Sequence, residues 1–224
     1  MTCTLALTLS ECFSNLDFQF GDRRINRRAN FMINKMSKRS EKSLSEIFCN
    51  AADLKGAYRF FDNDLVTPEK ILLPHSVETV KRCQQQSIVG LLQDSSDIAY
   101  DYLQCLDGFE PLHTNVEKGF RIHPLLAITE KGTPLGVLAA FNYTRIESDL
   151  PKKHRNSLLI EEKESYRWLL GYREACKLAE QAPGATVVSI SDREGDIYES
   201  LAEAQNPDIA HKASGALKPQ SIVR

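Results

Sequence analysis

The chain has 224 residues, of which 42% are hydrophobic and 26% are charged, and its formal net charge is −2. These proportions are ordinary for a globular protein, and the charge balance excludes a wholly basic protein but not a local basic patch. No window approaches about 18 consecutive apolar residues, so no membrane-spanning helix is expected. The six cysteines form no Cys-x-x-Cys pair. We therefore expect reduced thiols in a soluble cytoplasmic protein, with neither a zinc knuckle nor a disulfide framework.

Residues 1–86 are predicted to form a small helical module. Glycine and proline are sparse, and within 23–36 apolar residues recur at three- and four-residue steps, which makes one buried helix face. A second helical segment is expected at 43–62. A third is expected from Pro68, because a threonine precedes this proline and can cap the helix. We expect the third helix to break at Pro74, because proline removes a helical hydrogen bond.

The first predicted helix is strongly basic, with eight basic and two acidic residues between Gly21 and Lys42. Arginines at i and i+4 share a helix face and repel one another unless an anion lies opposite, and a phosphate backbone is a common partner. Arg59 is a further candidate within 56–63, where most of the aromatic rings are expected in the core. The candidate DNA-binding residues are Arg23, Arg24, Arg27, Arg28, Lys38, Arg39, Lys42 and Arg59. A solvated helix face or a protein-interaction bundle also fits this pattern.

Residues 87–204 are predicted to form an α/β fold, a mixed sheet with flanking helices. Apolar or alternating runs predict strands at 87–93, 95–100, 121–129, 135–143 and 185–190. A long helix is expected from Ile160 to about Ala182, and another after Asp192. The stretch at 103–119 is polar, contains Gly108, Pro111 and Gly119, and is expected to be a loop.

Two of the predicted strands are followed by an aspartate, Asp94 after 87–93 and Asp192 after 185–190. If these strands are neighbours in the sheet, both carboxylates come within bridging distance of one metal ion. Oxygen ligands without a His or Cys pair select Mg²⁺ or Mn²⁺, and such ions suit phosphodiester chemistry. Alternatively, Asp192 caps the helix that follows it, and the two aspartates are unrelated.

Several motifs occur in collinear order between about Phe20 and Glu203. They are Gly21-Asp-Arg-Arg-Ile-Asn-Arg-Arg28, Gly56-Ala-Tyr-Arg-Phe-Phe-Asp-Asn63, Pro74-His75, Gln93-Asp-Ser-Ser96, His123 after Gly119-Phe-Arg-Ile, Glu162-Lys-Glu-Ser-Tyr-Arg-Trp168 and Asp192-Arg-Glu-Gly-Asp-Ile-Tyr-Glu199. Together these motifs resemble the Tn5-like branch of the IS4-type transposases. Where the family usually has Asp-Thr-Thr, this chain has Asp94 followed by two serines, which keep the hydroxyl groups.

The resemblance implies a DNA-end-binding module at 1–86 and the first part of a ribonuclease H-like catalytic core at 87–204. It implies that Asp94 and Asp192 are catalytic and metal-ligating residues that use Mg²⁺ or Mn²⁺. The implied activity is metal-dependent DNA cleavage and strand transfer in transposition. The implied partner is double-stranded DNA at the terminal inverted repeats of a bacterial element, which would place the protein at the nucleoid when it is bound to DNA.

The resemblance also implies a third catalytic acid, a glutamate on a later helix with a Tyr-Arg-Glu-Lys pattern, and the sequence contains neither. Residues 205–224 depart from the family pattern and are polar, so we expect a divergent, disordered tail without a strand. We therefore expect a truncated, inactive form whose open sheet edge favours association. Two alternatives stay open, a DNA-end-binding inhibitor of an intact transposase and a non-functional remnant. A metal phosphohydrolase would need further His or Asp ligands at metal-site spacing.

Overall fold

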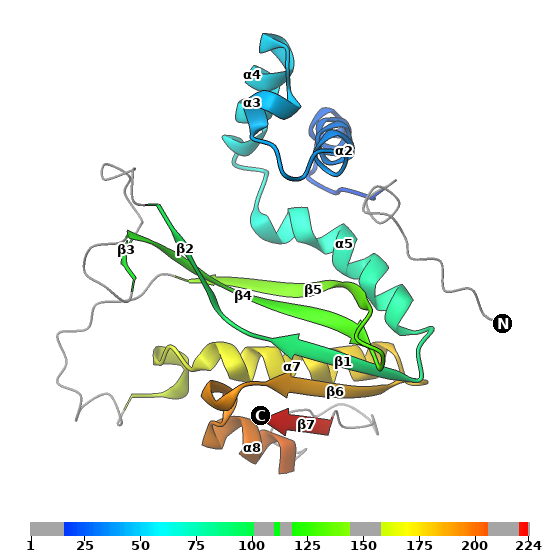
Figure 1. Cartoon of the computed structure of the whole chain (residues 1–224), viewed down its shortest axis with the longest axis vertical. Coiled ribbons are helices and arrows are strands. Elements are labelled where there is room, and N and C mark those ends of the chain that lie inside the picture. The colour runs from blue at the N-terminus through cyan, green and yellow to red at the C-terminus, as the bar shows by residue number, and fades with distance from the viewer. Residues whose placement is uncertain (1–15, 101–109, 113–117, 144–157, 206–219, 224) are drawn as a thin grey trace. The chain divides into compact units, whose positions relative to one another are not determined.

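The computed structural model describes residues 16–100, 110–112, 118–143, 158–205 and 220–223. The chain divides into two compact units, Met1–Val77 and Glu78–Arg224. Figure 1 labels the helices and strands of both units. In the described part of the chain, no helix is long and apolar enough to cross a membrane. The described cysteines, Cys49, Cys83 and Cys176, are free thiols.

The first unit is helical. Its elements are α2 (Arg23–Met36), α3 (Leu44–Ile47), α4 (Ala51–Phe61) and the first part of α5 (Pro68–Cys83). The helix predicted at 23–36 is confirmed, and it begins where Asp22 Oδ1 accepts a hydrogen bond from the backbone N–H of Arg24 (2.7 Å). The segment predicted at 43–62 is two helices, and the second begins at Asn50, whose side chain accepts from Asp53 N (2.7 Å).

The core of the first unit is built from aromatic and aliphatic side chains of these helices and of the segments beside them, including Phe20, Phe48 and Phe60. Phe20 and Phe60 meet edge to face, with ring centroids 5.5 Å apart. The expectation that most rings of 56–63 lie in the core is wrong, because Tyr58 is 56% exposed and Phe61 is 47% exposed. Phe60 shares the buried face of α4 with Ala57, three residues earlier. Phe61, the last residue of the helix, meets the Phe60 ring at its edge (ring centroids 5.4 Å apart) but remains exposed.

Helix α5 runs without interruption through Pro74, so the predicted break at this residue is wrong. Packing on both sides of the proline explains the continuity, because tertiary contacts override local propensity. Ile71 packs against the core of the first unit, whereas Cys83 lies in the core of the second. The boundary between the units therefore falls inside a helix, whereas the sequence suggested a boundary after residue 86.

The second unit is an α/β unit with a mixed sheet, as predicted. Its strands are β1 (Ile88–Gln93), β2 (Ser96–Ala99), β3 (Glu110–Pro111), β4 (Lys118–Thr129), β5 (Pro134–Tyr143), β6 (Thr186–Ser191) and β7 (Gln220–Val223). Its helical elements are η1 (Ile160–Glu162), α7 (Tyr166–Gln181), η2 (Arg193–Gly195) and α8 (Tyr198–Gln205). The sheet order is β2-β4-β1-β6-β7, with β3 and β5 also paired to β4. Strands β1, β6 and β7 run parallel to one another, and β4 runs antiparallel to its partners.

Three local predictions for the second unit are corrected. Strand β4 begins at Lys118 and β3 also lies within 103–119, so that segment is not entirely a loop. The long helix begins at Tyr166, because the preceding residues form the 3₁₀ turn η1 and a separate turn. Residues 220–223 form β7, so the prediction that 205–224 contains no strand is wrong there.

Strand β7 pairs in parallel with β6, with Ile222 opposite Ile190. The edge of β6 that we expected to be open is therefore paired along this strand. The flanking sequence is polar, but a ladder depends on backbone N–H and C=O groups. The β-branched residues Ile222 and Val223 also favour a strand.

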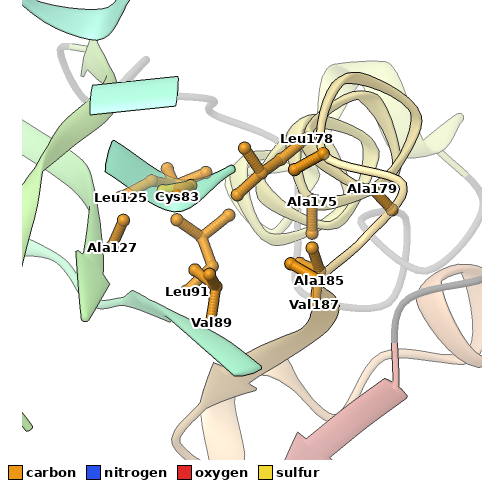
Figure 2. Packing of buried hydrophobic residues seen from close by; sticks show 11 residues of the cluster. Cys83, Val89, Leu91, Leu125, Ala127, Ala175, Leu178, Ala179, Ala185 and Val187 are labelled. Atoms are coloured by element: carbon orange, nitrogen blue, oxygen red, sulfur yellow. The ribbon is translucent and has the colours of Figure 1, made fainter. Parts of the chain in front are cut away.

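The apolar core of the second unit lies between the sheet and α7. Figure 2 shows Ala175 and Leu178 of α7 facing the strand residues Val89, Leu91 and Val187. The parallel register places Val89 beside Val187, so both side chains point to the same face of the sheet. Farther along this face, towards the carboxyl ends of β1 and β6, the buried side chains become polar.

Candidate metal site and DNA-binding surface

Asp94 and Asp192 directly follow two neighbouring parallel strands. The register pairs Leu92 of β1 with Ile190 of β6, and continuing it by two residues brings Asp94 opposite Asp192. Adjacent strands lie roughly 4.8 Å apart, and both aspartates are exposed. The condition set by the sequence, that these two strands be neighbours, is met.

Each aspartate also stabilises its own turn. Asp192 Oδ1 accepts from the backbone N–H of Glu194 (2.9 Å) and caps η2. Asp94 Oδ1 accepts from the N–H of Ser95 (2.7 Å). Among the described residues, neither Oδ2 atom has a hydrogen-bond partner. The helix cap that the sequence offered as an alternative for Asp192 is therefore real, and it is compatible with metal ligation by the other oxygen.

A hydrogen-bonded network of buried polar side chains lies beside the two aspartates. Gln93 Nε2 donates to Ser189 Oγ (3.1 Å), and Gln93 Oε1 lies 3.2 Å from His123 Nε2. His123 Nδ1 lies 2.9 Å from Ser95 Oγ, and Ser95 Oγ accepts from Arg167 Nε (2.8 Å). This network joins β6, β1, β4 and α7 near the carboxyl ends of β1 and β6. Buried polar groups generally need a hydrogen-bond partner, and these side chains supply one another.

His123 is the only aromatic ring among these hydrogen-bonded side chains, and its surroundings define its protonation state. It is fully buried and meets Trp168 edge to face, with ring centroids 4.6 Å apart. Burial, assisted by the positive charge of Arg167, lowers the pKa of His123 from 6.5 to about 4, although Asp192 acts in the opposite sense. Because a guanidinium only donates, the Ser95 hydroxyl can donate to Nδ1, and the neutral ring then donates from Nε2 to Gln93.

Arg167 connects this buried polar network to the turn that carries Asp192. Its Nη2 donates to Glu194 Oε2 (2.9 Å), and its Nη1 donates to the backbone C=O of Glu164 (2.6 Å). The guanidinium lies over the ring of Tyr143 at 5.4 Å and over that of Trp168 at 5.3 Å. Only 11% of the side chain is exposed, so Arg167 is a charged group held in place by several partners.

Two carboxylates at the ends of adjacent strands are a sparse but suitable donor set for Mg²⁺ or Mn²⁺. These hard ions prefer oxygen ligands, and Mg²⁺ is often held by only one or two carboxylates together with water. Within the described ranges, no group of three or more His, Cys, Asp or Glu side chains could hold a metal ion. An ion at Asp94 and Asp192 would therefore have these two carboxylates as its ligands from the described residues and would be bound weakly.

In the first unit, one acidic residue neutralises part of the basic helix. Asp53 on α4 lies 3.1 Å from Lys35 Nζ and 3.8 Å from Arg28 Nη1. Hydrogen bonds from Asn50 and Lys35 lower the pKa of Asp53. We predicted that the clustered arginines need an anion opposite, and for Arg28 the protein itself supplies one.

The other predicted DNA-binding residues differ in their partners. Arg24 pairs with Asp22 (2.9 Å) but its side chain remains 92% exposed, Lys42 lies 3.7 Å from Glu46, and Arg39 donates to the C=O of Glu46 (3.4 Å). Of the predicted residues, Arg23, Arg27, Lys38 and Arg59 are exposed and have no anionic partner within the described part of the chain.

Arg23 and Arg27 lie on the side of α2 opposite the buried residues Ala29 and Met32. They are four residues apart and therefore form neighbouring charges on one exposed face. Arg59 is exposed on α4, the helix that also exposes the rings of Tyr58 and Phe61. This unit thus offers uncompensated positive charge on two helices.

Sequence reasoning missed several residues around the aspartates. Arg167 lies within the motif 162–168, but nothing in its spacing indicated a contact with Ser95 or Glu194. Gln93 ended an apolar run that predicted a strand. The sequence did not indicate that its buried amide forms hydrogen bonds with His123 and Ser189. The sequence signal that could have revealed them is the occurrence of polar residues at strand positions whose side chains face the core.

Comparison with known proteins bears on the first unit. Residues 12–66 match the family model described as transposase DNA-binding. The match covers less than half of the chain and contains Arg23, Arg27 and Arg59. No curated protein matches the chain. The match supports a transposase N-terminal module, a transposase-related DNA-binding role and DNA as the partner.

Proposed function

We propose, starting from the transposase DNA-binding match at residues 12–66, that the chain is a Tn5-like, IS4-type transposase-family protein. Its first unit binds double-stranded DNA at the terminal inverted repeats of its element. Its second unit is the first part of a ribonuclease H-like core that uses Mg²⁺ or Mn²⁺. The observation that carries the DNA-binding part is the uncompensated positive charge of α2 within the matched segment.

The charge distribution supports DNA binding by the first unit. Among the described residues, no carboxylate pairs with Arg23 or Arg27, so neither has to release one before it meets a phosphate, whereas Arg28 shares Asp53 with Lys35. Phosphate contacts made by such residues supply most of the sequence-independent affinity for DNA. Arg59 is exposed on the same helix as two exposed rings, and an exposed arginine can contact a phosphate or a base edge.

The arrangement of Asp94 and Asp192 supports the metal-dependent part of the proposal. A divalent ion bound there would stabilise charge on a phosphodiester and activate the attacking hydroxyl group. The pairing of β1 with β6 brings the two carboxylates to adjacent strand ends. Two of the three acids that the resemblance implies are present in the sequence, so we expect little or no strand cleavage by this chain alone.

Replacing Arg23 and Arg27 together by alanine is expected to weaken DNA binding about tenfold. It should also reduce the slope of log K against log salt by about 1.8, because each phosphate contact contributes about 0.9. A gel-shift titration at several salt concentrations would measure both effects. The probes are duplexes carrying the terminal repeats of the element and unrelated duplexes of equal length.

The control for this experiment is Lys131→Ala/Lys177→Ala, which removes the same charge from exposed positions of the second unit. This control should leave affinity and slope unchanged. Equal binding by Arg23→Ala/Arg27→Ala and the unmodified chain would rule out the proposed surface. Equal affinity for both probes would leave DNA binding in place but exclude recognition of the repeats.

Replacing Asp94 or Asp192 by asparagine is expected to reduce Mn²⁺ affinity at least tenfold, because each change removes one of two charged ligands. Titration of the full chain followed by electron paramagnetic resonance of free Mn²⁺ would measure this loss. Asp64→Asn, an exposed carboxylate in the first unit, is the matched control. Mn²⁺ affinities that do not differ among the three variants and the unmodified chain would exclude the site.

A nicking assay on supercoiled plasmid in Mg²⁺ tests the expected lack of cleavage. Mg²⁺-dependent nicking that disappears in Asp94→Ala or Asp192→Ala would show that this chain cleaves DNA without the third acid. The alternative function, inhibition of an intact transposase by occupation of its DNA ends, would require only the DNA-binding segment that the family match supports.

A further inference from the structure

The segments that carry the two aspartates are joined through one side chain, Arg167. Ser95, which accepts from Arg167 Nε (2.8 Å), is the residue directly after Asp94. Glu194, which accepts from Arg167 Nη2 (2.9 Å), also donates its backbone N–H to Asp192 Oδ1. One guanidinium therefore connects both aspartate-bearing turns without occupying their free carboxylate oxygens.

We propose that Arg167 is the positioning residue that sets the separation of Asp94 and Asp192 and thereby the affinity of the second unit for a divalent cation. The inference rests on the proposed metal site and adds a residue that does not itself touch the ion. Partners that orient metal ligands commonly change metal affinity by about 10–100-fold when they are removed.

The surroundings of Arg167 make it a rigid connection. Its Nη1 is fixed by the C=O of Glu164 (2.6 Å), and the carboxylate of Glu164 is in turn held by Arg121 (3.2 Å). The rings of Tyr143 and Trp168 lie on the guanidinium. Because Arg167 is held by these contacts, a shift of the turn that contains Ser95 would also shift the turn that contains Glu194.

The second anchor, Ser95, is equally constrained. Its hydroxyl accepts from Arg167 Nε and from the hydroxyl of Tyr143 (3.4 Å), and it lies 2.9 Å from His123 Nδ1. Both lone pairs and the proton of Ser95 Oγ are therefore engaged. The position of Asp94 is determined through this hydroxyl by groups from three elements of the unit.

The shape of the guanidinium is essential to this role. Arg167 uses three different nitrogens in one plane for Ser95, Glu164 and Glu194. A lysine has the same charge but only one ammonium group, so it cannot hold all three oxygens in this geometry. Arg167→Lys therefore removes the positioning while it keeps the charge.

Charge and positioning make opposite predictions for the loss of this residue. A positive charge beside two carboxylates repels an incoming cation, so on charge alone Arg167→Gln should bind Mn²⁺ more tightly and Arg167→Lys should be unchanged. If Arg167 positions the ligands, both variants should bind Mn²⁺ at least tenfold more weakly.

The experiment is a Mn²⁺ titration of the full chain by electron paramagnetic resonance, with thermal unfolding recorded for each variant. Arg167→Lys and Arg167→Gln are compared with Arg173→Lys, an arginine of the same helix that pairs with Glu203 away from the aspartates. The expected result is a loss of at least tenfold for both Arg167 variants and no change for Arg173→Lys. Unchanged affinity in Arg167→Lys, or tighter binding in Arg167→Gln, would overturn the proposal.

A second pair of variants keeps the test decisive if the Arg167 variants do not fold. Glu194 is 65% exposed, so its replacement should not unfold the unit. Glu194→Gln removes its charge but keeps an acceptor oxygen for Arg167, whereas Glu194→Ala removes both. Weaker Mn²⁺ binding by Glu194→Ala than by Glu194→Gln supports the connection, and equal binding contradicts it.

The outcome also separates this inference from the proposed metal site. If Asp94→Asn and Asp192→Asn lose Mn²⁺ binding and Arg167→Lys does not, the site is real and the positioning role is wrong. If the unmodified chain binds no Mn²⁺ through Asp94 and Asp192, both proposals are wrong.

Discussion

Lowering the pH from about 6.5 to about 4 is expected to reduce the free energy of unfolding of the second unit by about 3 kcal/mol because of His123. The folded ring has a pKa of about 4, compared with 6.5 for an unperturbed histidine. Between these values the unfolded chain binds a proton that the folded unit does not. Stability is therefore constant above the unfolded pKa and falls as the pH drops towards the folded pKa.

Denaturant titration of the full chain and of His123→Gln at several pH values would measure this effect. The difference in unfolding free energy between the two proteins should change by about 1.4 kcal/mol per pH unit between about 6 and about 4.5. Carboxyls with lowered pKa values, such as Asp53, also reduce the free energy of unfolding as the pH falls, but they do so at lower pH than this window. Parallel pH profiles for the two proteins would show that His123 is not held neutral by the fold.

Replacing Gly171 by alanine is expected to destabilise the second unit by about 2 kcal/mol, although the same change in an ordinary helix stabilises by about 1 kcal/mol. Gly171 lies in the buried face of α7, and a Cβ atom there would overlap the side-chain amide of Gln93. Gln93 cannot move away without losing its hydrogen bonds to Ser189 and His123.

Gly184→Ala is the matched control for this substitution, because a Cβ atom at Gly184 would meet nothing within 4 Å. Its unfolding free energy should stay within about 0.5 kcal/mol of the unmodified chain, as for surface substitutions in general. Chemical denaturation would compare the two variants. Equal stability of Gly171→Ala and Gly184→Ala would mean that the Gln93 network adjusts freely.

Much of the first unit could be predicted from local patterns. The apolar spacing of 23–36 predicted a helix with one buried face, and the four-residue spacing of Arg23 and Arg27 predicted that these two side chains share a face. The pairing of Arg28 and Lys35 with Asp53 was not predicted, because the partner lies on a separate helix. The exposure of Tyr58 and Phe61 was missed, since aromatic residues are buried on average and only packing determines which rings are covered.

For the second unit, the sequence by itself determined β1, β2, β4, β5 and β6, their order along the chain and the two aspartates that follow β1 and β6. These are local properties, because an apolar run and the residue that ends it are adjacent in the chain. Only the tertiary structure decided that β1 and β6 are neighbours, since backbone N–H and C=O groups are the same in every strand and do not specify a partner. The same holds for β7, whose polar surroundings hid its pairing, and for Arg167, whose partners are 72 and 27 residues away. Contacts between residues far apart in the chain depend on packing, and it is these contacts that bring Asp94, Asp192 and Arg167 together.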